Sequence, residues 1–233
     1  MDSLNDNHGV VGYMHEERKN SMSFNYFMLN KDFIILGSDS RESYQNDTYD
    51  DNRQKTFVNK DLKLCWSFTG LTKIDGIDCI DIINIILNSK SDIIIKLQFI
   101  ENILCYQTLQ YFNKYQKDSI FDLFVAENSN NKINVYVLEV KNGISITKKN
   151  RVYYQGEITP NLASGVHTDM IKDINYRNMQ DKLKAPKELD RLIHLVMNES
   201  EKTDKTVGGD IYVVAMDNNG NIKTYINGVE KAF

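Results

Sequence analysis

The sequence predicts an α+β fold, a four-layer αββα sandwich with two antiparallel sheets between helix layers. Strand-like and helix-like runs follow one another in the order strands, two helices, strands, two helices, strands. Each run has an apolar face that has to be buried, and two sheets packed between layers of helices bury all of these faces at once. The chain has 233 residues, which is enough for one domain with a full core.

The strand predictions begin with two hairpins. In each hairpin, two runs rich in β-branched and aromatic residues flank a short turn made of Asn, Lys and Asp. The pairs are Phe24–Leu29 with Phe33–Leu36, and Lys55–Val58 with Leu62–Phe68. Further strands are expected from about residue 120 to residue 154, and a closing hairpin is expected around residues 218–220.

The helix predictions come from apolar residues spaced three or four apart. One face of segment 75–90 carries Ile77, Ile80, Ile83 and Ile86, and one stripe of segment 91–117 carries Ile95, Phe99, Ile103 and Tyr106. Two more helices are expected, one from about His167 to Lys182 and one that starts at Pro186. Proline suits the first turn of a helix because it has no N–H to leave unpaired.

Composition and charge exclude several classes of function. The net charge is -4 and both signs are mixed, which argues against a nucleic-acid binder. Three cysteines (Cys65, Cys79 and Cys105) lie in apolar runs without metal-ligand spacing, so reduced buried thiols are expected and no metal or cofactor is predicted. No apolar run has membrane-spanning length and the N-terminus lacks a signal-peptide segment. The sequence therefore indicates a cytoplasmic protein with no membrane partner.

Polar residues directly follow the second predicted strand, in the segment "FIILGSDSRES". Together with "LKLCWSFTGLTKIDG" and "TDKTVGGDIYVVAMDNNGNIKTY", this segment resembles proteasome β-type subunits and bacterial proteasome-like ring peptidases. The three segments occur in that family's order and cover the chain from about Ser23 to Tyr225. The resemblance implies the fold of N-terminal-nucleophile (Ntn) hydrolases, which agrees with the order of predicted elements.

The family's nucleophile is the first residue of the mature chain, and an Asp and a Lys follow it at fixed spacing. Here Asp39 and Lys55 follow Ser23 by sixteen and thirty-two residues. The resemblance thus implies that Ser23 is the nucleophile. It also implies that the N–H of Gly70 serves the oxyanion hole.

The implied chemistry is physically consistent. A chain-terminal serine carries a base in its own α-amino group, whose reference pKa is about 7.7–8.0. A nearby Lys55 ammonium would lower the pKa of both the amine and the hydroxyl, and Asp39 would orient Lys55. Donors such as the Gly70 N–H would stabilise the oxyanion. The expected reaction is acyl transfer to Ser23 followed by hydrolysis.

Two further residues carry roles only through the resemblance, namely Ser164 in the family's Ser-Gly pair and Asp204 in its late Asp-x-x-Ser-Gly-Gly segment. The chain departs from that second pattern, because Val207 stands where the family has Ser. A hydroxyl that would help to hold the α-amino group is therefore missing from that position.

The predicted boundary between extension and domain lies before Ser23. Residues 1–22 are expected to be an N-terminal extension, and residues 23–233 the hydrolase domain. Ser23 would become the first residue by autocatalytic cleavage after Met22, where the family usually has Gly. Alternatively, Met22 is the true initiator and is removed by ordinary processing.

The leading hypothesis is a peptidase subunit that hydrolyses peptide bonds inside a homo-oligomeric ring. Its substrate would be a peptide or an unfolded protein, and an ATP-dependent unfoldase would be its partner. Two alternatives stay open. One is a catalytically silent structural or binding subunit, which Val207 and Met22 favour. The other is a small-molecule amidase of the same fold.

Overall fold

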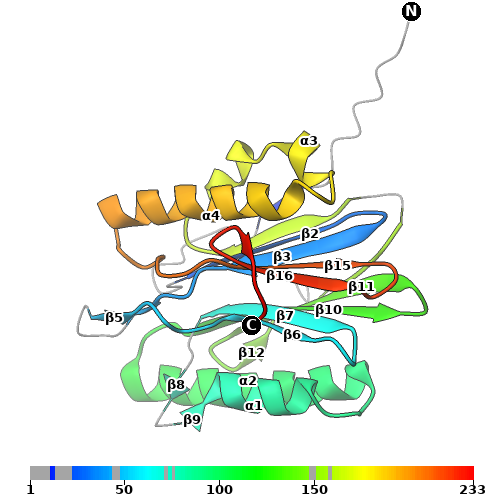
Figure 1. Ribbon diagram of the computed structural model, residues 1–233. Coiled ribbons are helices and arrows are strands. Elements are labelled where there is room, and N and C mark those ends of the chain that lie inside the picture. Colours follow the sequence, from blue (N-terminus) through cyan, green and yellow to red (C-terminus); the bar gives the residue numbers. More distant parts are fainter. Residues whose placement is uncertain are drawn as a thin grey trace, which may run out of the picture.

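The computed structural model describes residues 11–13, 23–43, 48–70, 73–74, 77–146, 151–156 and 159–233. Two large sheets lie face to face across the middle of the molecule (Figure 1). Helices lie on the outer side of each sheet (Figure 1). None of the helices described is both long and apolar enough to cross a membrane.

The larger sheet has seven strands in the order β1-β14-β2-β3-β15-β16-β17. These strands are β1 (Val11–Tyr13), β14 (Asn161–Gly165), β2 (Phe24–Leu29), β3 (Phe33–Ser38), β15 (Tyr212–Asp217), β16 (Ile222–Ile226) and β17 (Val229–Glu230). Neighbours are antiparallel except for β1, which pairs with β14 in parallel.

The second sheet has six strands in the order β12-β11-β10-β7-β6, with β13 also paired to β11. They are β12 (Ile144–Ser145), β11 (Lys132–Lys141), β10 (Ile120–Ser129), β7 (Leu64–Gly70), β6 (Thr56–Asn59) and β13 (Arg151–Tyr154). Two small hairpin sheets complete the strands, β4 (Glu42–Ser43) with β5 (Tyr49–Asp50) and β8 (Lys73–Ile74) with β9 (Ile77–Asp78).

The helices are α1 (Cys79–Leu87), α2 (Ile93–Tyr115), α3 (Tyr176–Met179) and α4 (Ala185–Lys202), with a 3₁₀ helix at Thr168–Asp173. Aspartates start the first two: Asp78 accepts a hydrogen bond from the Ile80 N–H, and Asp92 accepts one from the Ile94 N–H. An acidic oxygen at this position satisfies an N–H that has no partner within the helix.

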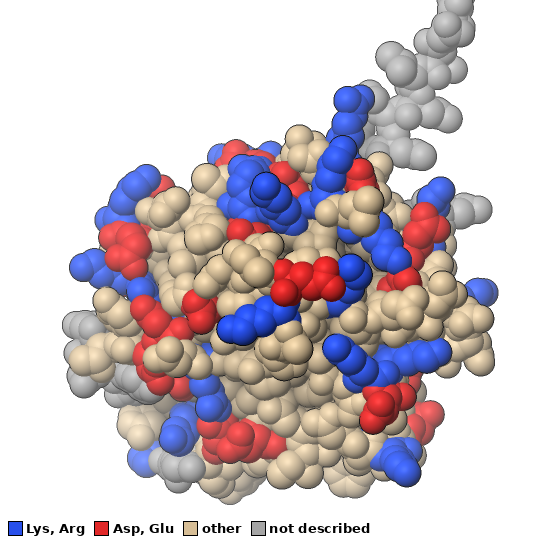
Figure 2. Space-filling model, viewed as in Figure 1, with Lys and Arg blue, Asp and Glu red and all other residues tan. Residues whose placement is uncertain are grey.

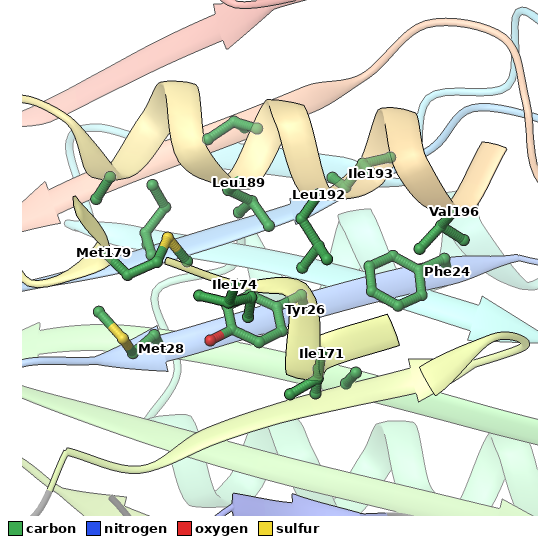
Figure 3. Close-up of a cluster of buried hydrophobic side chains, with 14 of the residues drawn as sticks. Phe24, Tyr26, Met28, Ile171, Ile174, Met179, Leu189, Leu192, Ile193 and Val196 are labelled. Carbon is green, nitrogen blue, oxygen red and sulfur yellow. The ribbon is translucent and has the colours of Figure 1, made fainter. Parts of the chain in front are cut away.

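Three apolar clusters hold the layers together. In Figure 3, Leu189, Leu192 and Val196 of α4 point toward Phe24 and Tyr26 of β2. A second cluster packs α1 and α2 on the six-stranded sheet. The third fills the space between the two large sheets with residues such as Phe27, Leu36 and Phe124. On the surface, basic and acidic side chains are interspersed over the face shown in Figure 2.

Most of the predicted elements are confirmed, including both hairpins and the helices in segments 75–90 and 91–117. The helix expected from His167 to Lys182 is wrong, since that segment forms a 3₁₀ helix and the single turn α3. The 3₁₀ helix stops at Asp173, and Asn175 begins α3 separately, because its side chain accepts a hydrogen bond from the Asn178 N–H. Polar side chains of this kind compete with the helical backbone for hydrogen bonds.

The predicted fold class, a four-layer αββα sandwich built on two antiparallel sheets, is wrong. The chain is mostly β, and its described strands form four sheets. Three of them are antiparallel throughout, while the largest contains the parallel β1–β14 pair. The β1–β14 and β4–β5 pairings lie in segments expected to be extension and loop, whereas β9 lies at the start of segment 75–90, which was expected to be helical. Backbone pairing there follows from N–H and C=O groups, which a pattern of apolar side chains does not report.

Candidate active site around Ser23

Three strand ends bring Ser23, Asp39 and Lys55 together. Ser23 precedes β2 and Asp39 follows β3, so the antiparallel pairing of these strands places the two residues at one edge. Lys55 precedes β6 of the facing sheet. Its Nζ donates a hydrogen bond to the Ser23 Oγ at 2.6 Å and lies 3.3 Å from the Asp39 Oδ2. The lysine therefore joins the two sheets at the hydroxyl.

All three side chains are removed from solvent. Ser23 is 3% exposed, Lys55 is 1% exposed and Asp39 is fully buried. Burying a charge is costly unless it is paired and hydrogen-bonded. The carboxylate of Asp39 meets that need, since it accepts hydrogen bonds from the backbone N–H groups of Phe24 at 3.0 Å, Arg41 at 3.1 Å and Gly208 at 3.2 Å.

Burial shifts the pKa of both charged groups toward the neutral form. It raises the pKa of Asp39, although Lys55 and the three backbone N–H donors oppose that change. Burial also lowers the pKa of Lys55, again against the attraction of Asp39. A lysine with a lowered pKa gives up a proton more readily, which is the property required of a general base.

The backbone of Ser23 is held from the opposite side by the end of β14. The N–H of Val166 donates to the Ser23 carbonyl oxygen at 3.0 Å. Gly165 has a φ of +102°, and a Cβ at that position would overlap the same carbonyl oxygen. Glycine is needed here because both the conformation and the close approach exclude a side chain.

Ser164 lies near the end of β14 and Gly70 ends β7, close to the edge that holds Ser23. The Oγ of Ser164 lies 2.8 Å from the Thr69 Oγ1 and donates to the carboxylate of Asp122. Gly70 is the next residue after Thr69 and has a φ of +113°. Ser164, for which a catalytic role was predicted, thus belongs to a hydrogen-bond network that links β14, β7 and β10.

Asp204 lies in the loop after α4, and its described contacts are with other residues than Ser23. Its Oδ1 accepts hydrogen bonds from Ser200 and Thr206, and its Oδ2 lies 3.1 Å from the Nε2 of His167. Although burial opposes it, these hydrogen bonds lower the pKa of Asp204. Val207 is fully buried and packs in the cluster under α4.

Sequence reasoning missed Asp122, Thr69 and His167. Asp122 could have been noticed as a lone acid inside the apolar run "IFDLFVAE". Thr69 meets Ser164 across two sheets, and His167 meets Asp204 across two loops. A single sequence carries no signal for contacts of this kind. Among the residues that the structure covers, no group of His, Cys, Asp and Glu side chains could hold a metal ion.

The predicted extension lies mostly outside the described residues. Strand β1 is described, but residues 1–10 and 14–22 are not, and Met22 is among them. The boundary before Ser23 and both routes that would free its amine stay predictions.

The chain thus carries a buried group of serine, lysine and aspartate side chains at the edge of two facing sheets. No family model and no curated protein matches the chain. Its fold is similar to that of Anbu from Hyphomicrobium sp. strain MC1, with a TM-score of 0.53, 10% identity, and coverage of 87% of this chain and 86% of that one. A "Gly-1" mutant of the same Anbu matches with a TM-score of 0.55, 10% identity, and coverage of 88% and 86%.

These comparisons correct the resemblance drawn from the sequence. Identification with the proteasome β-type family is wrong, because neither family models nor curated proteins support it. The two solved structures named above are of Anbu, which is proteasome-like but distinct. At 10% identity, the likeness shows a shared fold and nothing about activity.

Proposed function

We propose that this protein hydrolyses amide bonds and that Ser23 is its nucleophile. The observation that carries the proposal is the 2.6 Å hydrogen bond between the Lys55 Nζ and the Ser23 Oγ inside a buried site. A serine hydroxyl is a weak nucleophile on its own and needs an adjacent base or positive charge. Lys55 supplies one of these, and Asp39 holds the lysine in place.

The reaction would proceed through an acyl-enzyme. The Ser23 Oγ attacks the carbonyl carbon of the amide, and the hydroxyl proton passes to a nearby amine, which later delivers it to the leaving nitrogen. Water then attacks the ester carbonyl and releases the acid. The proton acceptor is the α-amino group of Ser23 if this residue is the first of the chain. Neutral Lys55 can take the same role, which the lowered pKa of its ammonium favours.

The expected substrate, ring and partner remain parts of the proposal. A peptide or an unfolded protein would be the substrate, within a homo-oligomeric ring fed by an ATP-dependent unfoldase. The two structural relatives are consistent with a proteasome-like relation of fold. A small-molecule amidase would use the same Ser23 chemistry, and assays on peptides against small amides separate the two.

A silent subunit is the second candidate, and one observation favours it. Asp204 is engaged by His167, Ser200 and Thr206, while Val207 is packed in the core. Asp204 and Val207, which lie in the segment expected to hold the α-amino group, are therefore engaged in contacts that support the fold. In that case Ser23 would be unreactive in every form of the chain.

The test is covalent labelling of chain that begins at Ser23, with its start verified by intact mass. A peptide epoxyketone, which reacts fully only with both a hydroxyl and a free amine, should add to Ser23. Ser23→Ala should abolish the adduct, and Ser129→Ala, at the exposed end of β10, should retain it. A fluorophosphonate needs only an activated hydroxyl, so it should also label the full chain if Lys55 is the base. No adduct with either reagent would support the silent subunit.

A further inference from the structure

We propose that His167 is a positioning residue whose side-chain contact with Asp204 holds together the two loops that fix the reactive group. The loops are residues 165–167, called here the β14 loop, and residues 204–208, called the α4 loop. The inference rests on the proposed function only for its effect on reactivity. The structural link itself can be tested without any activity.

The β14 loop sets the position of the nucleophile's backbone. The Val166 N–H donates to the Ser23 carbonyl oxygen at 3.0 Å, and Gly165 lies directly against that oxygen. His167 follows at once, with φ 55° and ψ 28°. This left-handed conformation is uncommon for a residue with a side chain, and such conformations often occur at functional sites.

The α4 loop sets the position of the acid that orients Lys55. The Gly208 N–H donates to the Asp39 Oδ2 at 3.2 Å, and the Gly208 carbonyl accepts from the Ser40 N–H at 3.1 Å. A Cβ at Gly208 would overlap the guanidinium of Arg41. A small shift of this loop would therefore move the carboxylate of Asp39.

The His167–Asp204 pair connects the two loops directly. The Nε2 of His167 lies 3.1 Å from the Asp204 Oδ2. This nitrogen is buried and makes no aligned hydrogen bond, so the contact is an electrostatic one between the imidazole and the carboxylate. The side chains of His167 and Asp204 are 17% and 37% exposed, so the pair is screened less than one on the open surface.

The other carboxylate oxygen of Asp204, Oδ1, is held by three hydrogen bonds. The Oδ1 accepts from the Ser200 Oγ at 2.6 Å, from the Thr206 Oγ1 at 2.8 Å and from the Thr206 N–H at 3.1 Å. These bonds fix the carboxylate at the end of α4 and direct its second oxygen to His167. The rigid end of a helix thereby anchors the β14 loop that carries the Ser23 contact.

The first experiment measures amide hydrogen exchange by NMR on the full chain, at one pH. In His167→Gln, the amides of Val166 and Gly208 should exchange about tenfold faster than in the wild type. His194→Gln is the matched control, because His194 also faces an aspartate (Asp190 at 3.7 Å) but both residues belong to α4 itself and join no loops. It should leave both amides unchanged. Unchanged protection in His167→Gln would overturn the proposal.

Charge rescue and a double variant exclude a general loss of structure. His167→Lys places a cation opposite Asp204 and should therefore restore most of the protection that His167→Gln loses. Asp204→Asn should accelerate the same two amides, and adding His167→Gln to it should bring no further increase, since the pair is already broken. Additive effects of the two substitutions would contradict a direct link.

The effect of His167 on the reactivity of Ser23 is measured with chain that begins at Ser23. In His167→Gln, the maximal rate of epoxyketone labelling should fall about tenfold, while the reagent concentration that gives half of that rate stays the same. A change in that concentration alone would place His167 in reagent binding and overturn a positioning role. If Ser23 is unreactive even in the wild type, the proposed function fails, while the exchange result still decides the loop link.

Discussion

Two aspartate–lysine pairs lie at opposite ends of the paired strands β3 and β15, and their electrostatics differ. Asp39 follows the end of β3 and pairs with Lys55 at 3.3 Å, and Asp217 ends β15 and pairs with Lys182 at 2.6 Å. Each aspartate also accepts backbone N–H bonds. The Asp39 pKa is nevertheless raised by burial. Burial also acts to raise the pKa of Asp217, but the hydrogen bonds from Lys182 and Asn221 together outweigh it and lower that pKa to about 2.

The difference lies in the lysines and in access to solvent. The side chain of Lys55 is 1% exposed and that of Lys182 is 47% exposed. At the Asp217 end, water solvates the lysine while the turn amides of Asn219 and Asn221 stabilise the carboxylate. At the Asp39 end, both charges are buried, which costs stability. The comparison teaches that the half-exposed pair supports the fold, while the buried pair, whose pKa values shift toward the neutral forms, costs stability at the place where we propose the chemistry.

The largest effect is expected for Lys55→Met. It should reduce the rate of Ser23 labelling about 10³-fold, since it removes the group that activates the hydroxyl. It should also destabilise the fold, because Asp39 would be left buried without its partner. Labelling rates per folded molecule, with folding checked by circular dichroism, measure the effect. A labelling rate within threefold of wild type would show that Lys55 has no part in the chemistry.

A smaller effect on labelling, about 10²-fold, is expected for Asp39→Asn, because Lys55 keeps its place but loses its orienting charge.

The pH dependence of the unfolding free energy should also change in Asp39→Asn. A carboxyl with a raised folded-state pKa binds its proton more tightly when folded. Stability is therefore lost as pH rises from about 4, the unfolded value, through the raised value. Urea unfolding from pH 4 upward should show that the variant lacks this slope.

Asp217→Asn should have the opposite dependence on pH. The pKa of Asp217 is lowered to about 2, so its contribution is present above about pH 4 and is lost as pH falls to 2. At pH 7 the variant should lose about 1–2 kcal/mol of unfolding free energy, and at pH 2 it should match the wild type. Labelling of Ser23 should be unaffected. A loss that is equal at both pH values would mean that packing, not charge, is responsible.

The smallest effect is expected for Lys182→Met, the counterpart of the lysine change in the active site. Half-exposed ion pairs contribute about 0.5 kcal/mol, and the turn amides continue to hold Asp217. Urea midpoints of the two lysine variants give the comparison directly. Equal destabilisation by Lys55→Met and Lys182→Met would remove the distinction between the two ends.

The sequence was informative wherever a local pattern decides the structure. Hairpins and long helices follow from periodicity. The resemblance to a family motif, matched at Ser23, Asp39 and Lys55, singled out three residues that the fold brings together. The stripe of Ile95 and Phe99 on α2 was less informative, because both residues are largely exposed while Leu97 and Ile100 face the core. An apolar stripe gives a period, but it does not say which of two apolar faces is buried.

Contacts between distant segments could not be predicted. The pair of His167 with Asp204 and the bond of Ser164 to Asp122 depend on how loops and sheets meet. The parallel pairing of β1 depends on backbone groups at a sheet edge. These features arise from tertiary packing, which a single chain does not encode in its local spacing.

Ser23, the proposed nucleophile, precedes a strand with a paired neighbour on each side, β14 and β3. Any displacement of its main chain would break bonds in two directions at once. An incoming ligand must therefore adjust its own shape to the hydroxyl. Complexes with inhibitors of different size should overlay closely at Ser23 and diverge only in the ligand.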